Sequence, residues 1–288
     1  MEKFELCIIG SGPAGYAAAI RAWDFGKKVC LIERGDLGGA GVHHGVLFSK
    51  TLWELSRDYL IATRHDRGYV AESVRLDYDQ VLRAAQIAID EKVDQLQRQL
   101  QHMAQPGSEH PGSITLIQGS AEFINPHQVF VSSKETGQSR EVEAEHFILA
   151  TGSRPREIGT VPVDGHRVLT SDHLMSQTEF PRSLVILGAG VVGCEFATIF
   201  ANFGQTKVNL IDRADRILPF EDEDISRVCS NNLEAKGVTI HHRANFIKME
   251  VVGDQVEYTI RHDTGGIETI PVDRALVSIG RVPNTDGI

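Results

Sequence analysis

The sequence predicts an α/β protein with two doubly wound domains, because one pattern of elements occurs twice along its 288 residues. The pattern is a short apolar strand, a glycine-rich turn, a helix and a second strand. A chain of this length corresponds to about two domains. The hydrophobic fraction of 41% and the charged fraction of 24% are ordinary for globular proteins. The composition therefore excludes disordered, collagen-like and coiled-coil chains.

The first copy starts near the N-terminus. We expect a strand over 4–9, a turn over 10–15 with the sequence GSGPAG, a helix over 16–25 and a strand over 28–32 that ends on Glu33. In such a turn the first glycine permits a tight bend, and the second lets backbone N–H groups approach a pyrophosphate. The third glycine lets helix and strand pack closely. The carboxylate at the end of the second strand accepts hydrogen bonds from ribose hydroxyls.

The second copy repeats this design. A strand over 183–187 leads into GAGVVG at 188–193, a helix over 194–203 and a strand over 207–211 that ends on Asp212. In each copy the acid follows the last glycine of the turn by 18 or 19 residues. A GxGxxG run alone is weak evidence, but here its full context is present twice. The sequence therefore predicts two Rossmann-like dinucleotide sites, with electrons passing between two dinucleotides. The candidate residues are Gly10, Gly12, Gly15, Glu33, Gly188, Gly190, Gly193 and Asp212.

The segment between the copies holds one long helix and several short strands. Apolar residues from 78 to 103 recur at spacings of three and four, which predicts an amphipathic helix of about seven turns. We favour a helix that faces a core over one that binds a partner. A polar connector is expected at 105–113, and strands at 114–118, 129–132 and 141–143, before an apolar run at 147–150. Glycine and proline within 151–155 mark a boundary. The predicted domains are 1–150 and 151–280, and 281–288 begins a return into the first.

Charge and cysteine spacing exclude further classes. With 29 Lys+Arg and 39 Asp+Glu the net charge is −10, which argues against a partner that is a nucleic acid or an anionic membrane. Four cysteines stand far apart without a zinc-finger spacing. The first residues enter a strand without a leader, and no apolar run approaches about 18 residues. We therefore expect a cytoplasmic protein.

Two pairs of adjacent histidines, His43-His44 and His241-His242, invite a metal-binding interpretation. Neighbouring residues point in opposite directions on an extended segment and do not face each other on a helix. We expect no metal site.

Three further motifs complete a recognisable order. They are GSAEF at 119–123, ATGSRP at 150–155 and SIGRVPNT at 278–285. With the two glycine turns, they make the chain resemble the pyridine nucleotide–disulfide oxidoreductases, in the branch of dihydrolipoamide dehydrogenase and the soluble transhydrogenase. The resemblance implies FAD at the first turn and NAD(P)H at the second. It also implies cofactor contacts from Gly39, Lys50, Ala121, Thr151, Gly152, Gly280 and Arg281.

The sequence departs from this family at the redox disulfide. The family reads Gly-Gly-x-Cys-x-x-x-Gly-Cys-x-Pro-Ser-Lys, whereas residues 38–50 read GGAGVHHGVLFSK. Gly41 and Val46 stand at the cysteine positions, so thiol–disulfide exchange by this route is chemically impossible. The transhydrogenase branch also lacks the second cysteine and has a histidine where His43 stands. For His43 a role beside the flavin is one interpretation, and an ordinary surface or packing role is the one we prefer. Three of the four cysteines that the chain does contain are expected in the core: Cys7, Cys30 and Cys194.

Two charged positions carry the implied chemistry. In the family the lysine at the Lys50 position lies near the flavin N5 and pairs with a glutamate at the Glu195 position. Two unrelated surface charges are the alternative here. At the second turn, Asp212 favours a free 2′-hydroxyl and hence NAD(H). The cations Arg213 and Arg216 next to it leave NADP(H) open.

The function that we expect is hydride transfer from NAD(P)H to FAD and on to a small non-disulfide acceptor: another nicotinamide, a quinone or a dye. The alternative is a non-catalytic dinucleotide-binding or sensor relative, or a fragment, of the same family. Family chains continue into a returning strand and a dimerisation domain, and this sequence ends at Ile288. We therefore expect a homodimer only from a longer parent chain, and an incomplete first domain in this one.

Overall fold

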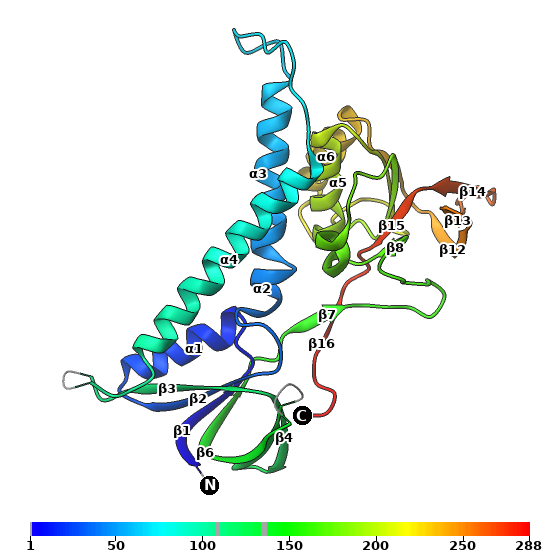
Figure 1. Ribbon diagram of the computed structural model, residues 1–288. Helices are drawn as coiled ribbons and strands as arrows, with labels where there is room; N and C mark the ends of the chain where they lie inside the picture. Colours follow the sequence, from blue (N-terminus) through cyan, green and yellow to red (C-terminus); the bar gives the residue numbers. More distant parts are fainter. Residues whose placement is uncertain (1, 108–109, 134–136) are drawn as a thin grey trace. The chain divides into compact units, whose positions relative to one another are not determined.

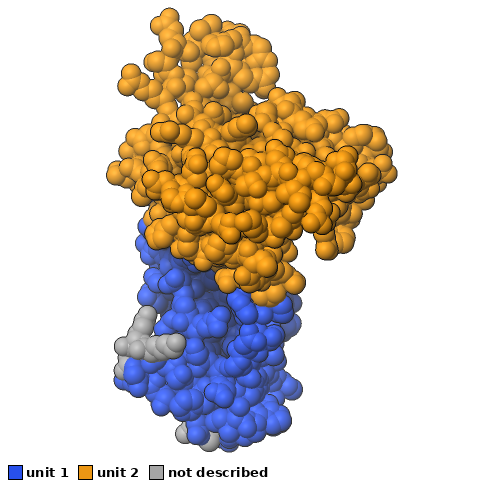
Figure 2. Space-filling view, turned by 90° about the vertical axis from the view of Figure 1, so that its right-hand side faces the viewer, with its two compact units in different colours: residues 1–48, 87–154, 283–288 blue, residues 49–86, 155–282 orange. Residues whose placement is uncertain are grey.

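The computed structural model describes residues 2–107, 110–133 and 137–288. The chain forms two compact units, which Figure 2 shows in different colours. Unit 1 comprises residues 1–48, 87–154 and 283–288, and unit 2 comprises residues 49–86 and 155–282. Both units contain a sheet with parallel strands and helices packed with it (Figure 1), so the predicted fold class is confirmed.

Unit 1 contains a six-stranded sheet in the order β3-β2-β1-β6-β5-β4. Its strands are β1 (Glu2–Ile9), β2 (Lys28–Glu33), β3 (Ser113–Gln118), β4 (Ser120–Asn125), β5 (Gln128–Ser132) and β6 (Ser139–Leu149). The first three and β6 run parallel, whereas β4, β5 and the beginning of β6 form an antiparallel meander. Helix α1 (Pro13–Asp24) packs on the parallel strands. The core beneath the sheet includes Phe4, Cys7, Cys30, Ile32, Val129 and Val142.

Three further helices follow β2: α2 (Gly39–His43), α3 (Val46–Ala62) and α4 (Tyr78–His102). Helix α4 is the predicted amphipathic helix, and its apolar stripe is buried. Within unit 1, the Tyr16 hydroxyl on α1 donates to Gln99 Oε1 on α4 at 2.7 Å. The core-facing interpretation is therefore confirmed. Part of the expected connector after α4, residues 108–109, lies outside the described residues.

Unit 2 contains a five-stranded parallel sheet in the order β11-β10-β9-β15-β8. Its strands are β8 (Val168–Leu169), β9 (Ser183–Leu187), β10 (Lys207–Ile211), β11 (Thr239–His241) and β15 (Arg274–Val277). The accompanying helices are η1 (Ser171–Ser176), α5 (Val191–Phe203) and α6 (Glu223–Ala235). A separate antiparallel sheet consists of β12 (Asn245–Val252), β13 (Gln255–Arg261) and β14 (Ile267–Val272), and it packs on the parallel sheet through a shared core. The short strands β7 (Ser153–Pro155) and β16 (Arg281–Pro283) pair with each other.

The compact units differ from the expected domains in residues 49–86, which pack with unit 2. Contacts between α3 and α5 explain this placement. The Tyr59 and Phe203 rings lie 6.3 Å apart, and Asn202 Nδ2 donates to Ser56 Oγ at 3.1 Å. Residues 283–288 pack with unit 1, and Ile288 contacts its core.

Candidate functional site

The two glycine turns have the same geometry. Gly10 and Gly188 both have a φ of +103°, which a residue with a Cβ rarely adopts. The Gly10 N–H donates to the Ile32 carbonyl at 2.8 Å, and the Gly188 N–H donates to the Ile211 carbonyl at 2.9 Å. These hydrogen bonds hold each turn against the strand that ends on the candidate acid.

The third glycine of each turn is required by close packing. A Cβ added at Gly15 would lie 1.8 Å from the Gly10 carbonyl oxygen. A Cβ added at Gly193 would lie 2.0 Å from the Gly188 carbonyl oxygen. These distances are far below any van der Waals contact, so both helices approach their turns only because these residues lack a side chain.

The middle glycine of each turn faces open space. Gly12 and Gly190 are the N-cap residues of α1 and α5, and neither supplies a side-chain cap. A Cβ built on either would have no atom of the described residues within 4 Å. The first N–H groups of both helices therefore face room for a ligand, and phosphates bind well at such helix ends. The two sites fit a dinucleotide pyrophosphate.

The acid of the first site is oriented by backbone and serine donors. Glu33 Oε2 accepts from the Ser11 N–H at 2.7 Å and from Ser11 Oγ at 2.6 Å. Its Oε1 accepts from the Gly35 N–H at 2.8 Å. The Ser11 hydroxyl was not among the predicted site residues, because nothing in the GxGxxG pattern specifies its middle positions.

The acid of the second site is held in the same way. Asp212 Oδ2 accepts from the Ala189 N–H at 2.7 Å, and Oδ1 accepts from the Ala214 N–H at 2.9 Å. Each carboxylate oxygen can accept a further hydrogen bond. The half-buried Asp212 can thus receive ribose hydroxyls without any rearrangement of its own contacts.

Four of the residues implied by the resemblance lie around the first turn. A Cβ at Gly39 would come within 3.1 Å of Gly12 Cα. Ala121 is buried in β4, two residues after Gly119, whose N–H donates to the Glu33 carbonyl at 2.7 Å. Thr151 and Gly152 follow β6, and their carbonyl oxygens each accept a hydrogen bond from Asn284 at 3.0 Å.

Gly280 and Arg281 lie in unit 2, after β15. The Gly280 carbonyl oxygen accepts from the Arg156 N–H at 2.9 Å, and Arg281 begins β16.

Lys50 on α3 and Glu195 on α5 form an ion pair, although 145 residues separate them. Lys50 Nζ lies 2.5 Å from Glu195 Oε1, and the side chains are 58% and 17% exposed. Ser49 Oγ donates to the same oxygen at 3.0 Å. The structure therefore brings the two predicted charges together and adds a serine that sequence reasoning missed. The only sequence feature that could have indicated Ser49 is its position directly before Lys50.

The segment at the disulfide position has no room for a thiol at residue 41. A Cβ added at Gly41 would lie 2.6 Å from Cγ of Pro13, a ring at the start of α1. Val46 begins α3 and is 60% exposed. His43 Nε2 contacts the Leu37 carbonyl oxygen at 3.0 Å, which agrees with a packing role.

The cysteines are free and mostly buried. Cys7, Cys30 and Cys194 lie in the core as predicted, and Cys229 is half-buried. A hydrogen bond with Cys7 and burial raise the pKa of the Cys30 thiol, and burial raises the pKa of Cys194 to about 12. Thiols with raised pKa values are poor nucleophiles.

No group of three or more His, Cys, Asp or Glu among the described residues is placed to hold a metal ion. The rings of His43 and His44 are tilted with centroids 6.1 Å apart. Within the same residues, no helix combines the length and the apolar character that crossing a bilayer requires.

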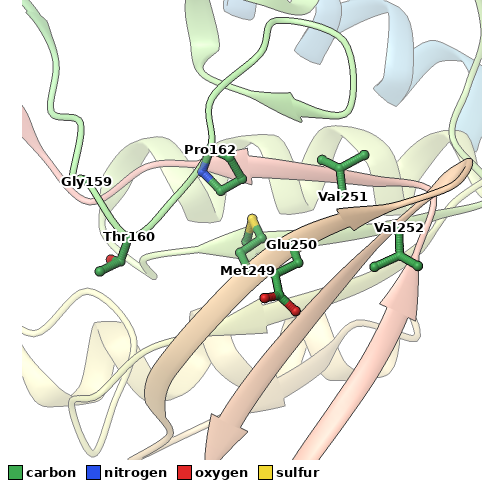
Figure 3. A pocket seen from close by; sticks show the side chains of 7 residues that line it. All are labelled: Gly159, Thr160, Pro162, Met249, Glu250, Val251 and Val252. Atoms are coloured by element: carbon green, nitrogen blue, oxygen red, sulfur yellow. The ribbon is translucent and has the colours of Figure 1, made fainter.

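A surface hollow of about 640 Å³ lies in unit 2 (Figure 3). The residues that line it are Gly159, Thr160, Pro162, Met249, Glu250, Val251 and Val252. None of the predicted site residues is among them, and the turns with their helix N-termini remain the better candidate for nucleotide binding.

Comparison with known proteins shows the family of the chain. The model of the pyridine nucleotide-disulphide oxidoreductase family matches residues 4–288, so the chain belongs to this family. The family uses FAD and NAD(P)H.

The alignments with individual relatives extend over nearly all of this chain but over only part of each relative. A dihydrolipoyl dehydrogenase of Bacillus subtilis is 35% identical over 98% of the chain, and a soluble pyridine nucleotide transhydrogenase of Chromohalobacter salexigens is 32% identical over 99%. The chain spans 59% of the length of each. Among solved structures, LpdA from Mycobacterium tuberculosis matches with a TM-score of 0.87 and 26% identity. That match covers 100% of this chain and 60% of the other.

Proposed function

We propose that the protein is a flavin-dependent oxidoreductase that accepts hydride from NAD(P)H and delivers electrons to a small acceptor other than a disulfide. Another nicotinamide, a quinone or a dye are the acceptor classes. Unit 1 would hold FAD through Gly10, Gly12, Gly15 and Glu33. Unit 2 would hold the nicotinamide dinucleotide through Gly188, Gly190, Gly193 and Asp212.

One observation supports this proposal above all: the protein forms the ion pair of the family although both redox cysteines are replaced. Gly41 and Val46 replace both cysteines, and Pro13 occupies the space beside Gly41. The ion pair between Lys50 and Glu195 is nevertheless formed. A protein that only binds nucleotides does not need this pair, whereas hydride transfer to a flavin benefits from a fixed positive charge.

The chain's own residues perform three tasks. The N–H groups at the starts of α1 and α5 bind pyrophosphates, and the carboxylates of Glu33 and Asp212 orient riboses. Glu195 holds the Lys50 ammonium in one position, and Ser49 fixes the carboxylate oxygen that receives it. FAD, when bound, supplies the hydride acceptor that protein side chains lack.

We further propose NAD(H) as the preferred nicotinamide cofactor. Asp212 repels a 2′-phosphate and accepts from a free 2′-hydroxyl. The Arg216 guanidinium donates to the carbonyl oxygens of Pro219 and Glu221 at 3.1 and 3.0 Å, so it is engaged within its own loop. Arg213 remains as an exposed cation next to the acid, which leaves binding of NADP(H) open at lower affinity.

The acidic balance supports a small-molecule partner and not a nucleic acid. We place the reaction in the cytoplasm. Dimer formation is proposed only for a chain that carries the dimerisation domain that the family resemblance implies.

The test measures NADH oxidation with added FAD against three acceptor types: a quinone, a nicotinamide analogue and disulfides such as lipoamide. We expect reduction of a non-disulfide acceptor and no disulfide turnover. Lys50→Met should slow flavin reduction more than it weakens NADH binding. The matched control is Lys248→Met, because Lys248 is also exposed and paired with a glutamate, Glu250.

Disulfide turnover at a rate near that of the quinone would contradict the proposed acceptor class. Tight nucleotide binding without oxidation of NADH by any acceptor would instead favour the non-catalytic alternative.

A further inference from the structure

The loop that contains Asp212 follows β10, and backbone hydrogen bonds connect it to the segment that follows the neighbouring strand β11. Strands β10 and β11 are parallel and in register, with Ile211 opposite His241. Their carboxyl ends therefore coincide at the edge where open α/β sheets bind ligands. The residues that follow each strand, 212–214 and 242–244, lie side by side along this edge.

Three backbone hydrogen bonds join residues 212–214 to the end of β11 and the segment that follows it. The Asp212 N–H donates to the His241 carbonyl at 3.1 Å, and the Ala244 N–H donates to the Asp212 carbonyl at 3.0 Å. The Arg243 N–H donates to the Ala214 carbonyl at 2.9 Å. Ala214 itself donates to the Asp212 carboxylate, which also accepts from the Ala189 N–H, so the segment after β11 contributes to the orientation of that carboxylate.

Arg243 has an unusual backbone conformation at the centre of this contact. Its φ is +50°, in the left-handed region, and among the described non-glycine residues only Leu218 shares a positive φ. This conformation is unfavourable for a residue with a Cβ and most unfavourable for a β-branched one. Here it aims two successive N–H groups, those of Arg243 and Ala244, at the Asp212 loop.

The Arg243 side chain explains little of this arrangement. It is exposed, and its Nε lies 3.8 Å from Asp263 Oδ2, a carboxylate that is also exposed. Ion pairs of this kind contribute little to stability. The strained backbone is therefore held by its two N–H donors and not by the guanidinium.

We propose that Arg243 is a positioning residue for cofactor specificity: its left-handed backbone fixes the Asp212 loop so that the carboxylate receives a 2′-hydroxyl. The inference rests on the proposed nicotinamide site in unit 2. A loop released from 242–244 loses the fixed carboxylate, so affinity for NADH falls more than affinity for NADPH. The NADPH complex does not use that carboxylate as an acceptor for the 2′ position.

The experiment measures dissociation constants of NADH and NADPH by fluorescence titration for the unmodified chain and for variants at one position. Arg243→Val introduces a β-branched residue that disfavours the left-handed region. It should reduce the NADPH-to-NADH ratio of dissociation constants by about threefold to tenfold, which is less than the complete loss of one charge-assisted hydrogen bond because the carboxylate is displaced and not removed. Arg243→Gly removes the guanidinium but tolerates the conformation, and it should keep the ratio within about twofold. Arg243→Ala serves as the milder strained variant where the valine variant fails to fold.

Two control variants define how far the ratio of dissociation constants can change. Arg261→Val makes the same replacement at an exposed residue of β13, where valine is favoured, and should leave the ratio unchanged. Asp212→Ala defines the ratio without the carboxylate.

The outcomes separate the two levels of the proposal. An unmodified chain that binds neither nucleotide contradicts the nicotinamide site itself and the inference with it. Binding with an unchanged ratio in both strained variants, whatever happens to thermal stability, contradicts the positioning role alone. A glycine variant that loses discrimination as fully as valine assigns the effect to the side chain and overturns the backbone mechanism.

Discussion

Asp212 is oriented by the protein before any ligand arrives. Both its oxygens accept from backbone N–H groups of rigid turns, Ala189 on one side and Ala214 on the other. A carboxylate fixed in this way loses little entropy when it accepts a ribose hydroxyl. The orientation of the carboxylate that we propose to discriminate between the two nicotinamide cofactors is thus defined by its neighbours' backbone and not by its own side-chain freedom.

Replacing Asp212 by alanine should narrow the preference for NADH. We expect the dissociation constant of NADH to rise more than tenfold, because hydrogen bonds to a charged group are worth about 1.5–3 kcal/mol. NADPH should bind no worse, since the repulsion disappears while Arg213 stays. Titration of both nucleotides checks this, with Asp215→Ala as the control acid of the same loop. Equal affinity of the unmodified protein for both nucleotides would show that the assignment is wrong.

Replacing two glycines of the second turn by alanine should affect different properties: stability at Gly193 and nucleotide binding at Gly190. Gly193→Ala places a Cβ 2.0 Å from a carbonyl oxygen and should lower the melting temperature by about 4–10 °C, as overpacking costs about 1–3 kcal/mol. Gly190→Ala meets no described atom within 4 Å, and its φ of −77° suits alanine. It should leave the melting temperature nearly unchanged and weaken NADH binding, because the methyl group enters the space for the pyrophosphate. Loss of stability in Gly190→Ala without loss of binding would contradict the assignment of that space.

At the scale of elements, sequence reasoning succeeds where burial is uniform. Strands β1, β2, β9 and β10 are apolar runs flanked by glycine turns, and they were predicted close to their observed bounds. In the region of β6 a strand was expected only over 141–143, but β6 is one strand, Ser139–Leu149. The reason is that it changes neighbours along its length: residues 139–143 pair with β5, whereas 142–149 pair with β1. Its burial therefore follows no single period.

Other elements escaped prediction because tertiary packing defines them. The sheet of β12, β13 and β14 is stabilised by a core shared with the parallel sheet, and this core places Met249 and Tyr258 beside Val185. No local pattern reveals that partner. The same holds for the pairing of Lys50 with Glu195, which the family resemblance implied and no periodicity could supply. The hydroxyls of Ser11 and Ser49 were missed for the same reason, since their function depends on acids far away in the sequence.

The turn before β8 offers a test of pH dependence. Asp164 Oδ1 accepts from the backbone N–H groups of His166, Arg167 and Val168 at 2.7–2.9 Å. Partial burial opposes ionisation, but these hydrogen bonds prevail and lower the pKa of Asp164. Because the folded pKa lies below the unfolded value of about 3.9, the stabilisation is present above about pH 4. It is lost as the pH falls through the folded pKa.

Asp164→Asn should therefore lower the free energy of unfolding at pH 7 by about 0.5–1 kcal/mol, a modest value because water screens this exposed carboxylate. The difference from the unmodified protein should shrink towards pH 3. Urea unfolding at several pH values measures it, with Asp263→Asn, an exposed acid of the β13–β14 turn, as the control. A difference that grows on acidification would contradict the sign of the pKa shift.

In the whole molecule, each unit contains the same arrangement of residues at its candidate nucleotide-binding turn. A positive-φ glycine, a close-packed glycine and an acid held by a turn N–H recur in both units with nearly equal distances. The units differ in how completely their sheets are paired. In unit 2, strand β15 is paired on both sides, with β9 and with β8. In unit 1, residues 146–149 of β6 pair with β1 on one side, and no described strand pairs with them on the other side.

This difference predicts unequal retention of the two cofactors by the 288-residue chain. Ile148 and Leu149 on the unpaired part of β6 are 38% and 57% exposed, so one side of the proposed FAD site lacks packing. We expect the chain to bind NADH but to lose FAD on dialysis and to show little turnover unless FAD is supplied in excess. Flavin absorbance after dialysis and NADH titration of the same sample measure both properties. Glu33→Ala should abolish the remaining flavin binding and leave NADH binding intact, whereas Asp212→Ala should weaken NADH binding alone. Stoichiometric FAD after dialysis, together with steady oxidation of NADH, would show that unit 1 needs no further strand to hold its cofactor.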